Sequence, residues 1–246
     1  MFKGLQEYTE SLTLISKLGL WKYFTIPIII SVFIATTIAI SAYGLSDNLG
    51  SWISEIWGWD WGKSAFTTFS TIMSAIIILA IGLIIFKHVV MALSAPFMSP
   101  VSEKIESHLT GRSNSTSRQT NFMSQLWRGI RINGRNLILE LLITIPILLL
   151  KLIPIVNIFS TALLFLVQAY YAGFGNMDYT LERHLTYRDS IKFVRKNRAV
   201  AVGNGIGFLL LLLVPFVGVL MVLPFSVTAA SVSTVRLLNN KPVDAR

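Results

Sequence analysis

The chain has 246 residues, of which 53% are hydrophobic and 13% are charged, about half the share of charged residues that is typical of a soluble domain. This composition predicts a single all-α integral membrane domain over residues 1–246. The sequence has no cysteine and three scattered histidines, which excludes disulfides, thiolate metal sites and cysteine nucleophiles. Nucleotide-binding and protease motifs are also absent from it. We therefore expect no metal, no cofactor and no enzymatic activity.

The first half of the chain predicts an interfacial helix and two transmembrane helices. Residues 1–22 place apolar side chains at helical spacing, with charged residues elsewhere, which is typical of a helix lying in the membrane interface. Segments 23–46 and 64–98 each contain an uncharged run of at least 23 residues. About 20 residues suffice to cross the hydrocarbon core. Residues 47–63 then form the outer loop between the two helices.

The second half has two apolar regions, 137–175 and 199–235, and each folds back at a proline. Almost no polar residue accompanies the turns at Pro154 and Pro215, and the arm 199–214 makes only about 24 Å of helix against a hydrocarbon core of about 30 Å. We therefore expect two half-penetrating (re-entrant) helical hairpins beside the two long transmembrane helices, with six ordinary spans as the alternative. The remaining predicted segments are a cytoplasmic helical segment at 99–136, a cytoplasmic basic helix at 176–198 and a cytoplasmic tail at 236–246.

The net charge of +9 is unevenly distributed and predicts the orientation of the chain. The outer loop is acidic, whereas segments 99–136 and 176–198 together carry twelve arginine and lysine residues. By the positive-inside rule these segments and both termini are cytoplasmic. Topology and anionic lipid head groups account for this basic charge, so we expect membrane lipids and no nucleic acid as partners. The outer loop also predicts an interfacial aromatic belt, with a carbohydrate platform as the alternative, formed by Trp52, Trp57, Trp59 and Trp61.

Charged residues near the membrane give a possible pore or polar path. Lys151 precedes the turn of the first hairpin, so it is a deep functional cation if the hairpin stops inside the bilayer and a snorkelling lysine if the hairpin spans. Glu140, near the entry of the same hairpin, is either an interfacial carboxylate or a proton relay. Arg128, Arg131 and Arg135 recur at i, i+3 and i+7 and form a basic stripe that either attracts an anion or holds lipid phosphates.

A corner between the interfacial helix and the first transmembrane helix is a further candidate site. It consists of Gly19, Leu20, Trp21 and Lys22. If a new helix starts here, its free backbone N–H groups and the positive end of its dipole are suited to a small anion, with Lys22 supplying charge. An ordinary glycine corner with tryptophan and lysine anchors is the alternative.

Several motifs, in the same order along nearly the whole chain, resemble those of a known family. They are the corner followed by Pro27, Ala95-Pro96-Phe97-Met98, an acidic helix with Glu103 and Glu106, the pair Asp178-Tyr179, and the turns at Pro154 and Pro215. In these motifs the chain is similar to the CysZ sulfate-permease family of bacterial inner membranes. The wider group includes the eukaryotic etoposide-induced membrane protein.

The resemblance implies a fold with two long transmembrane helices and two half-penetrating hairpins. It also implies passive, channel-like uptake of sulfate or a related small oxyanion for sulfur assimilation and cysteine biosynthesis. The anion then binds at the corner Gly19 to Lys22, where Trp21 and Lys22 stand in place of the family's arginine pair, and Glu103 and Glu106 join the possible polar path. We further expect a homo-oligomer. The alternative function is a non-transporting membrane module that organises lipid or a partner protein.

Overall fold

The computed structural model describes residues 2–55, 62–111, 121–150 and 154–239, and the regular elements in these ranges are all helices, which confirms the all-α prediction. They are α1 (Phe2–Lys17), the short 3-10 helix η1 (Leu20–Tyr23), α2 (Thr25–Ser54), α3 (Lys63–Thr110), α4 (Phe122–Leu150), α5 (Pro154–Leu181), α6 (Tyr187–Lys196), α7 (Arg198–Leu212) and α8 (Val217–Asn239). Four segments are long and apolar enough to cross a membrane, namely Thr25–Ser54, Ile81–Thr110, Ile158–Leu181 and Val217–Asn239. The chain is therefore a multi-pass membrane protein.

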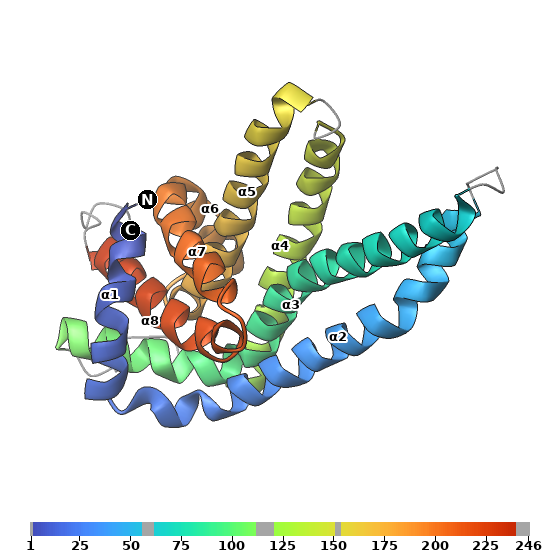
Figure 1. The fold of residues 1–246 in the computed structure, drawn as a ribbon. Helices are drawn as coiled ribbons and strands as arrows, with labels where there is room; N and C mark the ends of the chain where they lie inside the picture. The colour runs from blue at the N-terminus through green and yellow to red at the C-terminus, as the bar shows by residue number, and fades with distance from the viewer. Residues whose placement is uncertain (1, 56–61, 112–120, 151–153, 240–246) are drawn as a thin grey trace.

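Three helical hairpins leave a common base (Figure 1). The pair α2 and α3 is the longest, and the pair α4 and α5 leaves the base in a different direction. The pair α7 and α8 is short and stays at the base, where α1 runs beside α8. The chain reverses between α4 and α5, just before Pro154, and between α7 and α8, at Pro215, which are the two turns that the sequence predicts.

The hydrophobic core lies at this base, where α1, α3, α5, α7 and α8 meet. Ile15, Leu20 and Phe24 are fully buried there against Met91 and Met98 of α3. Only 17% of the apolar part of α2 is buried inside the chain, compared with 72% for α8. The α8 helix is therefore the centre of the fold, whereas most of α2 presents apolar side chains to its surroundings.

Small residues bring α5 and α7 into backbone contact. A β-carbon added at Gly205 of α7 would lie 1.6 Å from the carbonyl oxygen of Ala169, and one added at Gly173 of α5 would lie 1.8 Å from that of Ala201. On each helix the two small residues are four positions apart, a spacing that is typical of closely packed membrane helices. Only glycine fits at these two positions because the space of a side chain is filled by the neighbouring backbone.

The α3 helix continues through two internal prolines, and Tyr179 of α5 and Arg183, just after α5, contact its backbone on either side of Pro96. The Tyr179 hydroxyl donates to the carbonyl oxygen of Met91 at 2.6 Å. The Arg183 guanidinium donates to the carbonyl oxygen of Ser99 at 3.3 Å. Proline weakens a helix by removing a hydrogen bond, and these two contacts anchor α3 to its neighbour on both sides of Pro96.

Several helices run beyond the segment boundaries expected from the sequence. The α2 helix ends at Ser54 rather than at 46, and α3 ends at Thr110 rather than at 98. The α4 helix joins the end of the expected segment 99–136 to the first arm of the first hairpin, and α5 continues to Leu181. Hydropathy marks the limits of the apolar layer, and a helix does not need to end there. Trp52 is exposed on α2, and the other three tryptophans of the expected belt lie outside the described residues.

Candidate functional site

The expected anion corner lies where α1, η1 and α3 pack together. Gly19 has φ 60° and ψ 40°, a left-handed conformation that strains any residue with a β-carbon. This turn directs Leu20 into the core, where Leu20 and Phe24 are completely buried. Backbone geometry and core packing therefore fix the corner, while Trp21 and Lys22 remain exposed.

Two lysines flank one aromatic ring at this corner. The Nζ atom of Lys22 lies 5.4 Å from the centroid of the Tyr23 ring, and that of Lys104, from α3, lies 5.2 Å from the same centroid. Such cation–π contacts position an ammonium group without neutralising its charge. Sequence reasoning missed Lys104 because it is distant from the corner in the sequence and only the packing of α3 against η1 brings it there.

Trp21 closes one side of the corner. Its ring meets Phe24 edge to face, with 6.3 Å between the ring centroids. Its indole N–H donates to the hydroxyl of Ser16 at 3.4 Å. Trp21 therefore shapes the wall of the corner, and the charge there comes from Lys22 and Lys104.

Glu106, an expected path residue, is the centre of an ion cluster between α3 and the end of α5. Its carboxylate accepts a hydrogen bond from Arg183 Nη2 at 2.9 Å and contacts His184 Nε2 at 2.7 Å. Arg183 Nη1 also donates to the Ser102 hydroxyl at 2.7 Å. The cluster ties α3 to the segment that directly follows α5. Glu103 lies half-buried on the same helix.

The three arginines of the α4 stripe contact α5 and α6 in three different ways. Arg128 forms a two-point ion pair with Asp178, in which Nε and Nη2 each lie 2.9 Å from a carboxylate oxygen. The Arg131 guanidinium stacks 4.1 Å from the centroid of an aromatic ring of α6, and Arg135 lies 5.6 Å from one of α5. The stripe therefore packs α4 against its neighbours, and its members do not converge on one anion site.

Glu140, another expected path residue, is completely buried in a second ion cluster. The Nζ atom of Lys87 lies 2.5 Å from one carboxylate oxygen, and the Nε2 atom of His88 lies 2.9 Å from the other. All three side chains are 2% exposed or less. Sequence reasoning missed these partners of Glu140. The sequence does contain a signal for these partners, because Lys87 and His88 are the only titratable residues between Lys63 and Glu103.

Small cavities lie on either side of this buried cluster. Lys87 lines a cavity of about 240 Å³ with Gln168, between α3, α5 and α7. His88 lines another of about 220 Å³ with Asn133, between α3 and α4. Glu140 contacts both Lys87 and His88, so the buried cluster lies between the two cavities.

The expected path residues do not gather in one place. Lys87 and Lys104 are 17 residues apart on α3, which corresponds to about 25 Å along the helix. The Glu140 cluster and the corner are therefore separate sites. Lys151, the remaining expected path residue, lies outside the described residues.

Glu182, directly after α5, is a further buried acid that sequence reasoning missed. It is 3% exposed, and its Oε1 atom has no hydrogen-bond partner within the described residues. Burial, and to a smaller extent the charge of Asp178, raises the pKa of Glu182 to about 8 against the opposing charges of Arg183 and Arg128. The side chain therefore keeps its proton at neutral pH in the folded protein.

This raised pKa predicts how stability changes with pH. The folded protein holds the Glu182 proton up to about pH 8, whereas the unfolded chain releases it near the ordinary value of 4.5, so the folded state binds more protons in between. Stability is therefore expected to fall as pH rises through this window. In Glu182→Gln this part of the pH dependence is lost, so the variant gains melting temperature relative to the parent at pH 8 but not at pH 4.5. Equal melting curves for both proteins across the window would contradict the assignment.

Comparison with known proteins tests the resemblance stated for the sequence. The family model described as Sulfate transporter CysZ/Etoposide-induced protein 2.4 matches residues 8–222. Proteins named Sulfate transporter CysZ in two strains of Pseudomonas aeruginosa, LESB58 and PAO1, are each 25% identical over 243 residues, which cover 95% of this chain and 94% of the relative. A protein of the same name from Pseudomonas fluorescens is 28% identical over 146 residues, 58% of each chain.

The match covers the corner and both ion clusters, and it ends in the second turn of α8. The family's description names a transporter and not an enzyme, in line with the expectation from the motifs. The resemblance is therefore confirmed, and the chain belongs to the Sulfate transporter CysZ/Etoposide-induced protein 2.4 family.

Proposed function

We propose that this protein is a channel-like permease for sulfate or a related small oxyanion in the bacterial inner membrane, where it supports sulfur assimilation. Family membership and the names of the Pseudomonas relatives support the substrate class. Four apolar helices of sufficient length support passage across a membrane. A passive permease requires only a binding site and a path, so the proposal needs no nucleotide site and no metal site.

The observation that carries the proposal is the pair of lysines at the corner. Lys22 and Lys104 lie at 5.4 and 5.2 Å from the Tyr23 ring centroid, beside the turn at Gly19. In this proposal an oxyanion at the corner is attracted by the ammonium groups of Lys22 and Lys104. Lys104 thereby supplies the second positive charge that Trp21 does not provide. Exposed lysines bind an anion strongly enough to select it and weakly enough to release it.

Buried polar groups support a path through the helical base. Serine, threonine and asparagine side chains of α3, α5, α7 and α8 have buried atoms without a hydrogen-bond partner in the described part of the chain, and these helices pack on one another. They include Ser94, Asn176, Thr180, Asn204 and Thr234. An unpaired buried polar group is costly in an apolar medium, so these groups favour water or a hydrated anion between the helices.

For the membrane arrangement we propose two long spanning helices, two hairpins that penetrate only part of the bilayer, and cytoplasmic termini. The α7 helix has 15 residues, or about 22 Å, which is shorter than a hydrocarbon core of about 30 Å. The turn that follows is apolar and exposed, with Leu213 71% and Phe216 87% accessible, which suits hydrocarbon better than head groups. The hairpins α2–α3 and α4–α5 also diverge, so they cannot both follow the membrane normal (Figure 1).

The test of the corner is sulfate uptake into liposomes that contain the purified protein. We expect Lys22→Ala and Lys104→Ala each to weaken saturable uptake or binding about tenfold, because each removes one charged contact to the anion. Lys63→Ala, which removes an exposed lysine at the distant start of α3, is the matched control and should leave uptake unchanged. Equal uptake by all three variants and the parent would remove the corner from the mechanism.

The same experiment decides between transport and the alternative of a non-transporting membrane module. The replacement of the family's arginine pair by Trp21 and Lys22 is the feature that favours this module. Absence of flux from correctly inserted protein, together with no effect of sulfate on its melting temperature, would make the module the better account.

The homo-oligomer that we propose uses the exposed apolar face of α2, which includes Ile29, Phe33 and Ile40. Measuring the mass of the protein in detergent by light scattering tests whether it forms this homo-oligomer.

A further inference from the structure

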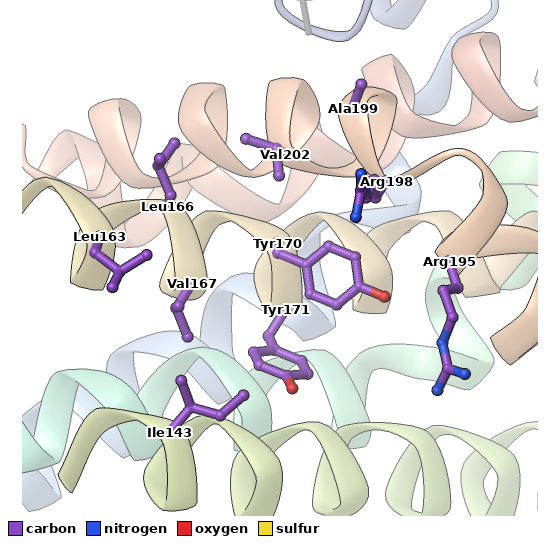
Figure 2. A pocket seen from close by; sticks show the side chains of 10 residues that line it. All are labelled: Ile143, Leu163, Leu166, Val167, Tyr170, Tyr171, Arg195, Arg198, Ala199 and Val202. Atoms are coloured by element: carbon purple, nitrogen blue, oxygen red, sulfur yellow. The ribbon is translucent and has the colours of Figure 1, made fainter. Parts of the chain in front are cut away.

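An apolar trough of about 680 Å³ runs between α4, α5 and α7 (Figure 2). Its walls are formed by Ile143 of α4, by Leu163, Leu166 and Val167 of α5, and by Val202 of α7. The volume lies within the range of about 300–1,000 Å³ that is typical of ligand pockets. Three wall residues, Ile143, Leu163 and Leu166, remain at least 40% exposed, so the trough is open to the surroundings along its length. This part of the site suits a hydrocarbon chain.

One end of the trough is polar and positively charged. Tyr170 and Tyr171 lie there, and the same end holds Arg195, from the last turn of α6, and Arg198, the first residue of α7 (Figure 2). Within the described residues neither arginine is paired with a carboxylate, unlike Arg128. Both guanidinium groups are therefore available to an anion, and the N-terminus of α7 adds the positive end of its dipole.

The surrounding charges reinforce this positive end. The charge of Arg135 acts on the Tyr170 hydroxyl together with those of Arg195 and Arg198. The carboxylate whose charge acts on the neighbouring Tyr171, Glu140, is already engaged by Lys87 and His88 in the buried cluster. A negatively charged group at the mouth of the trough therefore lies beside Arg195 and Arg198, and the charge of Arg135 acts on the same region.

We propose that the trough is a binding site for one anionic phospholipid, with its phosphate at Arg195 and Arg198 and an acyl chain along the apolar walls. A free phosphate or sulfate ion uses only the charged end and leaves the walls unfilled. A zwitterionic lipid fills the walls, but its own cation weakens the attraction to the arginines. Basic pockets between membrane helices are typical sites for anionic lipid head groups. The guanidinium group also matches the geometry of phosphate better than an ammonium group does. This binding does not depend on the proposed transport function.

The test is native mass spectrometry of the full-length protein titrated with phosphatidylglycerol or phosphatidylcholine. We expect the parent to retain phosphatidylglycerol at least fivefold more strongly than phosphatidylcholine. The double variant Arg195→Gln/Arg198→Gln should lose at least fivefold in phosphatidylglycerol binding. The matched control is Arg188→Gln/Lys192→Gln, which removes two exposed charges from the same α6 helix outside the trough and should change binding less than twofold.

A second variant separates the trough from general surface charge. Leu166→Trp fills the apolar wall without changing any charge and should also weaken phosphatidylglycerol binding. It keeps the test informative if the arginine variant fails to fold. The proposal is overturned if trough and control variants lose binding equally, if Leu166→Trp binds as the parent does, or if inorganic phosphate at equal concentration displaces the lipid completely, since a small-anion site then explains the data.

Discussion

Replacing Glu140 with alanine is expected to lower the free energy of unfolding by about 3–5 kcal/mol, the range found when one partner of a buried ion pair is removed. Glu140 is completely buried, and its two carboxylate oxygens are engaged by Lys87 at 2.5 Å and His88 at 2.9 Å. Without the carboxylate, Lys87 is left as a buried cation with no counter-charge. The variant is therefore expected to unfold at a clearly lower temperature in detergent.

A double variant distinguishes this ion pair from simple loss of packing. Lys87→Met/Glu140→Leu replaces both charges with apolar groups of similar size, so it should recover most of the stability that Glu140→Ala loses. Glu55→Ala, at the exposed end of α2, is the control for removal of a carboxylate and should change the melting temperature little. If Glu140→Ala melts at the same temperature as Glu55→Ala, the carboxylate is not needed in the fold.

Replacing Gly205 with alanine is expected to destabilise the protein by about 1–3 kcal/mol or more, the cost of overpacking a core. The added β-carbon would lie 1.6 Å from the carbonyl oxygen of Ala169, so α5 and α7 must move apart. Gly173→Ala should act in the same way, because its β-carbon would lie 1.8 Å from the carbonyl oxygen of Ala201. Separation of these helices also opens the base of the fold, where both belong to the packed core.

Gly134 of α4 is the matched control because an added β-carbon there has no atom within 4 Å. In a helix, alanine is more favourable than glycine by about 1 kcal/mol, so Gly134→Ala should raise the melting temperature slightly. The same substitution is thus expected to have opposite signs on α4 and α7, as measured by thermal unfolding in one detergent. A stabilised Gly205→Ala protein would show that α5 and α7 are not in backbone contact.

The sequence by itself determined the class of this protein, its helical content and its family. Each of these properties depends on the local composition of a segment, since about 20 uncharged residues suffice to cross a bilayer and a proline turn is visible in the residues that form it. The corner at Gly19 was also predictable from local sequence, because its glycine stands between two helical patterns. Helix ends were less well determined, since α2 and α3 continue as helices beyond the apolar layer.

Only the tertiary structure decided which charged groups meet. It placed Lys104 beside Lys22, paired Glu140 with Lys87 and His88, and buried Glu182 next to Asp178. The periodicity of one helix shows which face is polar but not which helix will cover that face. Burial and Coulomb attraction depend on the distance between groups in space, and the partners of Lys22 and Glu140 come from segments that are far apart in the chain. Their pairing is therefore set by how the three hairpins pack at their base.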